Sequence, residues 1–209
     1  MNHSTAKNNI LKKIRMALSH TTPLPFPKAE RNENVFQSAQ QDPVVEFAEQ
    51  FTQLLGKFVF CIDQHELEEQ FTRLCNQNEW SKIFCSEEKW RSLIHPKIMH
   101  NDISDCDASI TGCEFLVART GSIIMSATGQ GRLPSVYAPV HVCIATTSQL
   151  VYDIKDGLTG LKNKYRQNLP SLITFATGPS RTADIEKTLV VGVHGPKEVY
   201  CFVVDDQQS

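Results

Sequence analysis

Short apolar runs alternate with helical patterns between residues 43 and 99, and this alternation constrains the fold more than any other feature of the chain. The first helical pattern begins at Asp42-Pro43, where Asp is a good N-cap and Pro suits the first helical position, and it ends at Gly56. Strand-like runs follow at 58–62, 82–85 and 97–99, separated by helical patterns at 67–75 and 86–94. Because the connections are short, this order predicts a parallel sheet flanked by helices.

The second half of the chain is richer in strand-like patterns. They lie at 114–117, 122–125, 140–145, 172–176, 189–193 and 199–204. One helical pattern interrupts them, with Ile154, Leu158, Leu161 and Tyr165 on one face. We therefore predict an α/β protein with a mixed, mainly parallel sheet flanked by helices.

The first 42 residues differ in character from the rest of the chain. An amphipathic, basic helix is predicted within residues 1–20, because Ile10, Leu11, Ile14, Ala17 and Leu18 recur at helical spacing. Three prolines and a polar stretch then indicate a linker over residues 20–42. We predict two parts, an N-terminal helix with its linker at 1–42 and a folded domain at 43–209. Docking on its own domain or on a partner is preferred for the helix over a transit peptide or a membrane-surface anchor.

Composition excludes several classes of function. The net charge of −2 argues against nucleic-acid binding, which needs clustered basic residues. No apolar run approaches the length of a membrane-spanning helix. The seven cysteines are widely spaced, without a Cys-x-x-Cys pair, and several lie in apolar runs. This pattern indicates a cytoplasmic protein that itself holds neither an iron–sulfur cluster nor any other cofactor or metal.

The segment 177–186 is the most informative for chemistry. It follows an apolar run, so it lies at the carboxyl end of a strand, where α/β proteins bind ligands. Gly178-Pro179 allows a tight turn, and Ser180 and Thr182 are suitable caps for a helical turn at 183–187. Arg181 together with exposed amides suits a carboxylate or phosphate. Asp184 and Glu186 are alternatively ion-pair partners of Arg181, and an ordinary strand-to-helix turn remains an equal interpretation.

Three shorter segments add candidate ligand-binding groups. His194, which precedes Gly195-Pro196, can approach a ligand and exchange a proton, or can hydrogen-bond its own loop. Thr120-Gly121-Ser122 predicts a tight turn with two hydroxyls, and His141 lies at the start of a strand. Gly129 and Gly131 lie in a flexible loop that matches neither a dinucleotide fingerprint nor a P-loop.

These segments occur in the same order as in a known family. With Ile110-Thr111-Gly112, they resemble the LUD domain of the lactate utilisation protein C family over roughly residues 43–205, and the motifs at 178–186 and 192–196 are specific. The resemblance implies the fold of the CoA-transferases and sugar-phosphate isomerases. It also implies two partner proteins that carry iron–sulfur clusters, in a set that oxidises L-lactate to pyruvate. This chain would be the cluster-free subunit.

Three hypotheses remain open for the chain itself. The first is a subunit of a lactate-oxidising complex, the second is a stand-alone enzyme acting on a phosphorylated sugar or a CoA thioester, and the third is a non-catalytic scaffold. One departure from the family affects the first hypothesis, because Arg119 stands where many relatives carry an acidic residue. For the first hypothesis the candidate catalytic residues are His194, Arg181, Asp184 and Glu186. The candidate ligand-binding residues are Thr120, Gly121, Ser122, His141, Gly178, Pro179, Ser180, Thr182 and Gly195.

Overall fold

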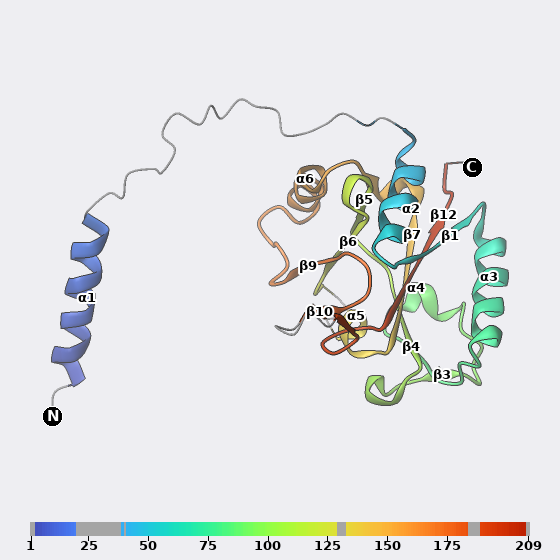
Figure 1. Ribbon diagram of the computed structural model, residues 1–209, viewed down its shortest axis with the longest axis horizontal. Coiled ribbons are helices and arrows are strands. Elements are labelled where there is room, and N and C mark those ends of the chain that lie inside the picture. Colours follow the sequence, from blue (N-terminus) through green and yellow to red (C-terminus); the bar gives the residue numbers. More distant parts are fainter. Residues whose placement is uncertain (1–2, 20–38, 40, 129–132, 184–188, 208–209) are drawn as a thin grey trace. The chain divides into compact units, whose positions relative to one another are not determined.

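The computed structural model describes residues 3–19, 39, 41–128, 133–183 and 189–207 of the chain. Residues 39–209 form one compact unit, and residues 1–38 form another (Figure 1). Helix α1 spans His3–Ser19 in the N-terminal unit and exposes Ile10, Leu11, Ile14 and Met16. The predicted linker lies almost entirely outside the described residues.

A six-stranded, all-parallel sheet organises the larger unit. Its strand order is β1-β12-β7-β4-β2-β3, so β12, which comes last in the chain, lies between β1 and β7. The strands are β1 (Lys57–Cys61), β2 (Ile83–Cys85), β3 (Met99–His100), β4 (Ala108–Thr111), β7 (Val140–Thr146) and β12 (Glu198–Val204). This sheet confirms the predicted α/β class.

A second sheet of four strands packs beside the first. Its order is β8-β5-β6-β9, with the antiparallel pairs β5–β6 and β6–β9 and the parallel pair β5–β8. These strands are β5 (Phe115–Val117), β6 (Ser122–Ser126), β8 (Leu150–Val151) and β9 (Ile173–Ala176). A short antiparallel pair joins β10 (Arg181–Ala183) to β11 (Leu189–Val191). The sheet that we expected to be mixed is therefore divided among separate sheets, because periodicity does not specify which strands pair.

Helices cover both faces of these sheets. The α-helices are α2 (Pro43–Gln53), α3 (Gln64–Gln77), α4 (Glu88–Arg91), α5 (Pro134–Tyr137) and α6 (Ile154–Tyr165), and the 3-10 turns are η1 (Ile103–Asp105), η2 (Ala118–Thr120) and η3 (Thr147–Gln149). Asp42 caps α2 as predicted, with its carboxylate accepting the Val44 N–H at 2.8 Å. Helix α4 begins after Glu87 instead of Ser86, and it has no side-chain cap.

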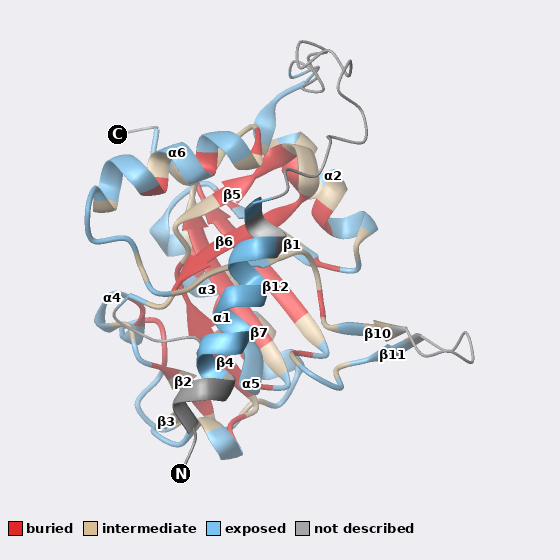
Figure 2. Cartoon of the chain, turned by 90° about the vertical axis from the view of Figure 1, so that its left-hand side faces the viewer, coloured by how far each residue is buried: buried red, intermediate tan, exposed pale blue. Residues whose placement is uncertain are grey.

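The buried side chains form three apolar layers, and the alternation along β7 and β12 separates two of them. Val142, Ile144 and Phe202 pack toward α3 and α4, whereas Cys143 and Cys201 face α2 and the second sheet. Leu161 of α6 covers the outer face of the second sheet. Figure 2 shows this arrangement, with buried residues in the strands and exposed residues along the helices.

Two predictions about individual elements were wrong. Leu158 of α6, expected on the buried face, is 43% exposed, because Gly157 and Leu161 occupy the contact with the sheet. Strand β4 was not anticipated, although it lies inside the six-stranded sheet and all its residues are buried. Its pattern was obscured by Ser109 and Thr111, whose hydroxyls are hydrogen-bonded to Pro134 O and His141.

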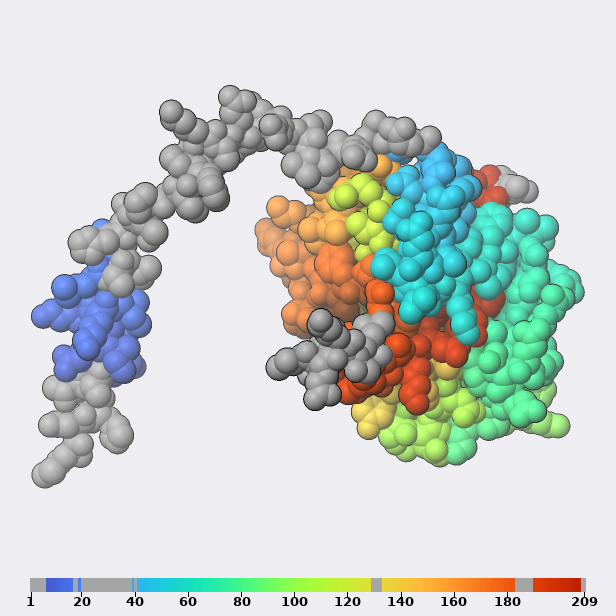
Figure 3. Space-filling view, viewed as in Figure 1, coloured from blue at the N-terminus to red at the C-terminus, as the bar shows by residue number. Residues whose placement is uncertain are grey.

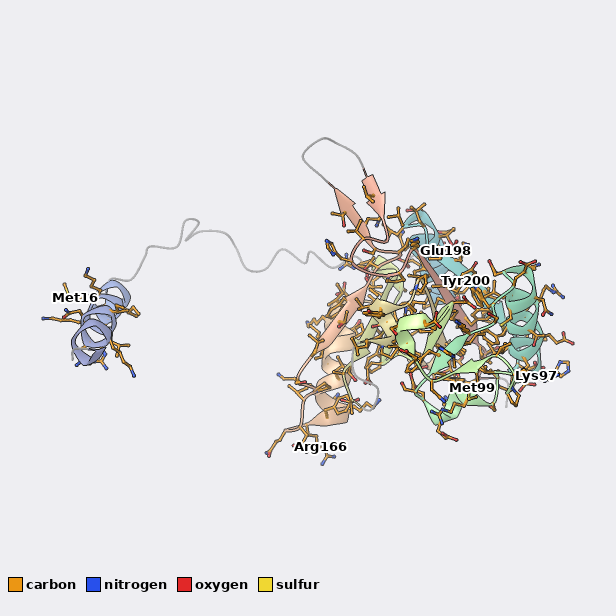
Figure 4. All side chains as sticks on the ribbon, turned by 90° about the horizontal axis from the view of Figure 1, so that it is seen from below. Met16, Lys97, Met99, Arg166, Glu198 and Tyr200 are labelled. Atoms are coloured by element: carbon orange, nitrogen blue, oxygen red, sulfur yellow. The ribbon has the colours of Figure 1, made fainter. Side chains whose placement is uncertain are left out.

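A polar cluster at one edge ties β1 to β12. Lys57 Nζ lies 2.6 Å from Glu198 Oε2 and donates to Tyr200 Oη at 2.8 Å. Figure 4 shows Glu198 and Tyr200 near each other on β12. Figure 3 shows that α2 and the red C-terminal residues share a surface of this unit.

All seven cysteines are free thiols, and six are buried, as expected for cysteines that act as small apolar residues. No helix among the described residues is both long and apolar enough to cross a membrane.

Candidate functional site

The two specific sequence motifs lie side by side. The Ser180 N–H donates to Pro196 O at 2.9 Å, and the Gly192 N–H donates to Ser180 O at 2.9 Å. At Gly195 a Cβ atom would stand 3.0 Å from Ser180 Cβ, so a larger side chain would push the two segments apart. The pairing follows from β10 and β11, whose strands continue from these contacts.

The glycines at 121 and 178 allow two turns to pack against α2. Gly178 has φ +79° and Gly121 φ +59°, values that favour glycine. A Cβ at Gly178 would lie 2.3 Å from Leu54 O, and one at Gly121 would lie 2.5 Å from Phe51 N. Both glycines therefore allow their loops to lie in close contact with the end of α2. Gly121, predicted to bind a ligand, has a packing role here.

A pocket of about 220 Å³ lies where these loops meet the two main sheets. Six of the predicted residues line it together: His141, Gly178, Pro179, Ser180, His194 and Gly195. The sequence therefore identified segments that are distant in the chain and share one cavity. Its other lining residues include Met125, Ser135, Val136, Thr174, Phe175 and Thr177.

His141 is the most unusual group in this pocket. It is the second residue of β7, its exposed fraction is 0%, and Nε2 lies 2.8 Å from Thr111 Oγ1. Its Nδ1 has no hydrogen-bond partner among the described residues. Burial lowers the pKa of His141 to about 4, because a low-dielectric surrounding disfavours the charged imidazolium. The ring is therefore neutral at physiological pH.

A row of hydroxyl groups connects the 120–122 turn to the pocket. Thr120 Oγ1 lies 2.8 Å from Ser122 Oγ, which lies 2.9 Å from Thr177 Oγ1. Only Thr177 lines the cavity, so Thr120 and Ser122 hold a lining residue in place. The turn itself forms as predicted, with Gly121 ending the turn η2.

The backbone at 181–183 differs from the predicted approach to a helical turn, and the rest of that turn, residues 184–187, lies outside the described residues. Arg181, Thr182 and Ala183 form strand β10 and not the start of a helical turn. The Ser180 N–H is already bonded to Pro196 O, so that amide does not point free toward a ligand. The Arg181 side chain is exposed and does not line the pocket. The predicted residues Asp184 and Glu186 lie outside the described residues, as do Gly129 and Gly131.

Arg119 has a structural partner. Its Nε lies 2.6 Å from Asp153 Oδ2, and Asp153 caps α6 by accepting the Lys155 N–H at 3.1 Å. Burial raises the pKa of Asp153, but the hydrogen bond from Arg119 and the backbone donors outweigh it and lower the pKa overall. Arg119 therefore stabilises the start of α6 and is already bound to a carboxylate of its own chain.

A second, polar pocket of about 420 Å³ lies at the carboxyl ends of β2 and β4. Glu114 there accepts hydrogen bonds from Ser126 Oγ at 2.5 Å, Tyr165 Oη at 2.6 Å and Lys164 Nζ at 2.7 Å. These contacts engage both oxygens of the carboxylate, so Glu114 joins β5, β6 and α6. Among the described residues, no group of three or more His, Cys, Asp or Glu side chains could hold a metal ion.

Sequence reasoning did not assign a role to several pocket residues. Thr111 was noted only as part of a family motif, yet its hydroxyl positions His141. Ser135 and Thr174 line the pocket, and neither showed a distinguishing pattern in the sequence. A polar residue inside a short buried strand is the one signal that could have pointed to Thr111, because such a hydroxyl requires a partner.

Comparisons with known proteins give a consistent picture. The model of the LUD domain matches residues 44–204. The chain is 33% identical over 111 residues to the lactate utilization protein C of Deinococcus radiodurans, covering 52% of this chain and 51% of that protein. It is 38% identical over 104 residues to that of Halalkalibacterium halodurans, covering 48% of this chain and 45% of that protein. The chain thus matches about half the length of these relatives.

A solved structure has the same fold. A crystal structure of a DUF162 family protein from Deinococcus radiodurans aligns with a TM-score of 0.61 at 18% identity. The alignment covers 80% of this chain and 99% of that one. At this identity the likeness concerns the fold alone.

Proposed function

This chain belongs to the LUD domain family, and on that basis we propose that it takes part in lactate utilisation. The relatives named lactate utilization protein C support this role. In the fuller form of the proposal, the chain is a cytoplasmic, cluster-free subunit of a system that oxidises L-lactate to pyruvate. The iron–sulfur clusters of that system belong to partner proteins, as the family resemblance implies.

We assign this function to one pocket because six of the motif residues line it. A water molecule takes up about 30 Å³ in the liquid. A pocket of about 220 Å³ therefore has room for a small carboxylic acid. His194 lines the pocket, and Arg181 directly follows the lining residue Ser180. We assign the carboxylate of the ligand to these two side chains, which requires the exposed Arg181 side chain to turn toward the pocket.

Binding of L-lactate to the full chain tests the site. Calorimetry is expected to give saturable binding, weakened at least tenfold by Arg181→Ala or His194→Ala. Arg73→Ala is the matched control, because Arg73 is an exposed arginine on α3, across the six-stranded sheet from the pocket. Unchanged binding in both pocket variants would remove this site from the proposal.

The pathway is tested separately in cells. Deleting the gene is expected to abolish growth on L-lactate while growth on pyruvate continues, and the intact gene should restore it. Turnover of L-lactate by the isolated chain, without cluster-bearing partners, would contradict the role of a subunit. Normal growth of the deletion strain on L-lactate would contradict the pathway itself.

A further inference from the structure

His141 carries a buried nitrogen whose hydrogen-bonding capacity is unused. Its Nε2 is engaged by Thr111, whereas Nδ1 is inaccessible to solvent and has no partner among the described residues. Most buried polar atoms in folded proteins are paired, because an unpaired one destabilises the fold. Burial of Nδ1 without a partner is therefore a cost that a bound ligand would remove.

The position of the ring shows which cavity a ligand would occupy. His141 lines the pocket formed by the 178–180 and 194–196 loops. Along β7 it has the same parity as Cys143, so it faces the second sheet and not α3. His194 is the other titratable side chain in the described lining, and no acidic side chain lies among these residues. Because Nδ1 has no solvent-exposed surface in this structure, a ligand reaches it when the pocket lining shifts, and it then meets a neutral imidazole without a carboxylate beside it.

We propose that Nδ1 of His141 hydrogen-bonds the α-oxygen substituent of a small carboxylic acid, so that the pocket selects α-hydroxy and α-keto acids over unsubstituted ones. This inference rests on the proposed function, which places a small carboxylate in the same pocket. In this arrangement His194 and Arg181 bind the carboxylate of the ligand, and His141 binds the oxygen on the α-carbon beside it. Selection then comes from a polar atom that only a substituted acid satisfies.

Thr111 allows one imidazole to serve both kinds of substituent. A hydroxyl both donates and accepts, and a neutral imidazole carries its proton on either nitrogen. When Nε2–H donates to Thr111 Oγ1, Nδ1 accepts a hydrogen bond from an alcohol. When Thr111 donates to Nε2, Nδ1–H donates to a ketone. Thr111 is therefore a positioning residue that adapts to the ligand without touching it.

Affinities of three acids for the full chain test the selection. L-Lactate and pyruvate are expected to bind about tenfold more tightly than propionate, which lacks the α-oxygen, because one neutral hydrogen bond contributes about 1 kcal/mol and the unpaired nitrogen adds to the difference. Equal affinity for all three acids would overturn the role of His141 and leave the proposed function intact. Absence of binding by any of them would instead contradict the proposed site.

Two substitutions at one position separate the two ring nitrogens. His141→Asn keeps a polar group near the position of Nδ1, whereas His141→Gln keeps one near Nε2. The preference for lactate over propionate is expected to survive in the Asn variant and to disappear in the Gln variant. The reverse result would overturn the assignment to Nδ1.

A measurement on the unsubstituted chain covers the case in which these variants fail to fold. With isotope-labelled histidine, nitrogen resonances report each ring's hydrogen bonding directly. Lactate is expected to shift the Nδ1 resonance of one neutral histidine, and propionate to leave it in place. At lactate concentrations that saturate the weakened His194→Ala variant, the same shift should persist, because His141 is its source. A shift that is missing from this variant although lactate is bound would overturn the proposal.

Discussion

Glu114 offers the sharpest test of how the second sheet is held to α6. Its side chain is 9% exposed and accepts hydrogen bonds at both oxygens. Oε1 accepts from Ser126 and Tyr165, and Oε2 accepts from Lys164. Replacing Glu114 by Ala removes all three bonds, whereas replacing it by Gln keeps an oxygen in the position of Oε1. The two variants therefore divide the network into its buried and exposed parts.

The geometry sets the expected magnitudes. Hydrogen bonds to a charged group contribute about 1.5–3 kcal/mol each, so losing the two at Oε1 costs about 3–6 kcal/mol in Glu114→Ala. The Lys164 side chain is 58% exposed. An ion pair to such an exposed partner contributes about 0.2–1 kcal/mol. With the weaker acceptor strength of a neutral amide added, Glu114→Gln should cost about 1–2 kcal/mol.

Urea unfolding measures these differences in the free energy of unfolding. Glu88→Ala is the matched control, because Glu88 is 90% exposed and makes only a 3.4 Å contact with Arg91. It should change stability by less than about 0.5 kcal/mol. A loss below about 1 kcal/mol in Glu114→Ala would refute the reasoning, since two part-buried bonds to a carboxylate are expected to contribute more than that.

The same network predicts a pH dependence. Burial raises the pKa of Glu114, but hydrogen bonds from Lys164, Ser126 and Tyr165 outweigh it, so the folded pKa is lowered. The contribution of Glu114 is fully present above the unfolded pKa of about 4.3 and is lost as pH falls through the lower folded value. The stability gap between the wild-type protein and Glu114→Ala should therefore narrow below about pH 4. A difference in stability that increases as the pH falls would contradict the lowered pKa of Glu114.

Two further substitutions test other contacts. Gly121→Ala should destabilise the protein by at least about 2 kcal/mol in urea unfolding, because it places a Cβ in a left-handed conformation and against the Phe51 backbone. Gly121→Asn should not recover this loss, because Asn tolerates the left-handed conformation but still carries the Cβ. Full recovery in Gly121→Asn would show that the contact with the Phe51 backbone is unimportant. Arg119→Ala should cost about 1–3 kcal/mol by leaving the buried carboxylate of Asp153 with one charge partner fewer. The difference in stability between the wild-type protein and Arg119→Ala, measured by thermal unfolding, should decrease as pH drops below about 3.9, because the pKa of Asp153 is lowered in the folded protein. A difference that does not depend on pH would exclude the ion pair.

Local patterns predicted most of the elements because their causes are local. The cap at Asp42 and the stripe that buries Phe47 and Phe51 both lie within α2, so the helix could be recognised from its own residues. Pairing between strands depends on residues far apart in the chain. The division into separate sheets, and the place of β4 inside the larger one, could not be derived from periodicity.

Six of the residues predicted for the site line one pocket, whereas Thr120, Gly121, Ser122, Arg181 and Thr182 are absent from its described lining. Gly178 and His194 were found because glycine turns after strands tend to line ligand sites, and both border the pocket. A helical turn was expected beside Arg181 because Ser180 and Thr182 resemble helix caps, whereas β11 pairs with this segment as a strand. The unpaired Nδ1 of His141 depends on everything that surrounds it and has no signature along the chain.

The position of β12 has a consequence for the order in which the chain acquires its structure. This strand, residues Glu198–Val204, is inserted between β1 and β7. A ribosome makes β1 roughly 140 residues before it makes β12, at a rate of about 5–20 residues per second. The edge of β1 lacks its neighbour throughout that interval, and the edge of β7 lacks it for roughly the last 60 residues. The emerging chain must therefore be shielded from self-association for about 7–28 seconds, and the sheet closes only when its last strand arrives.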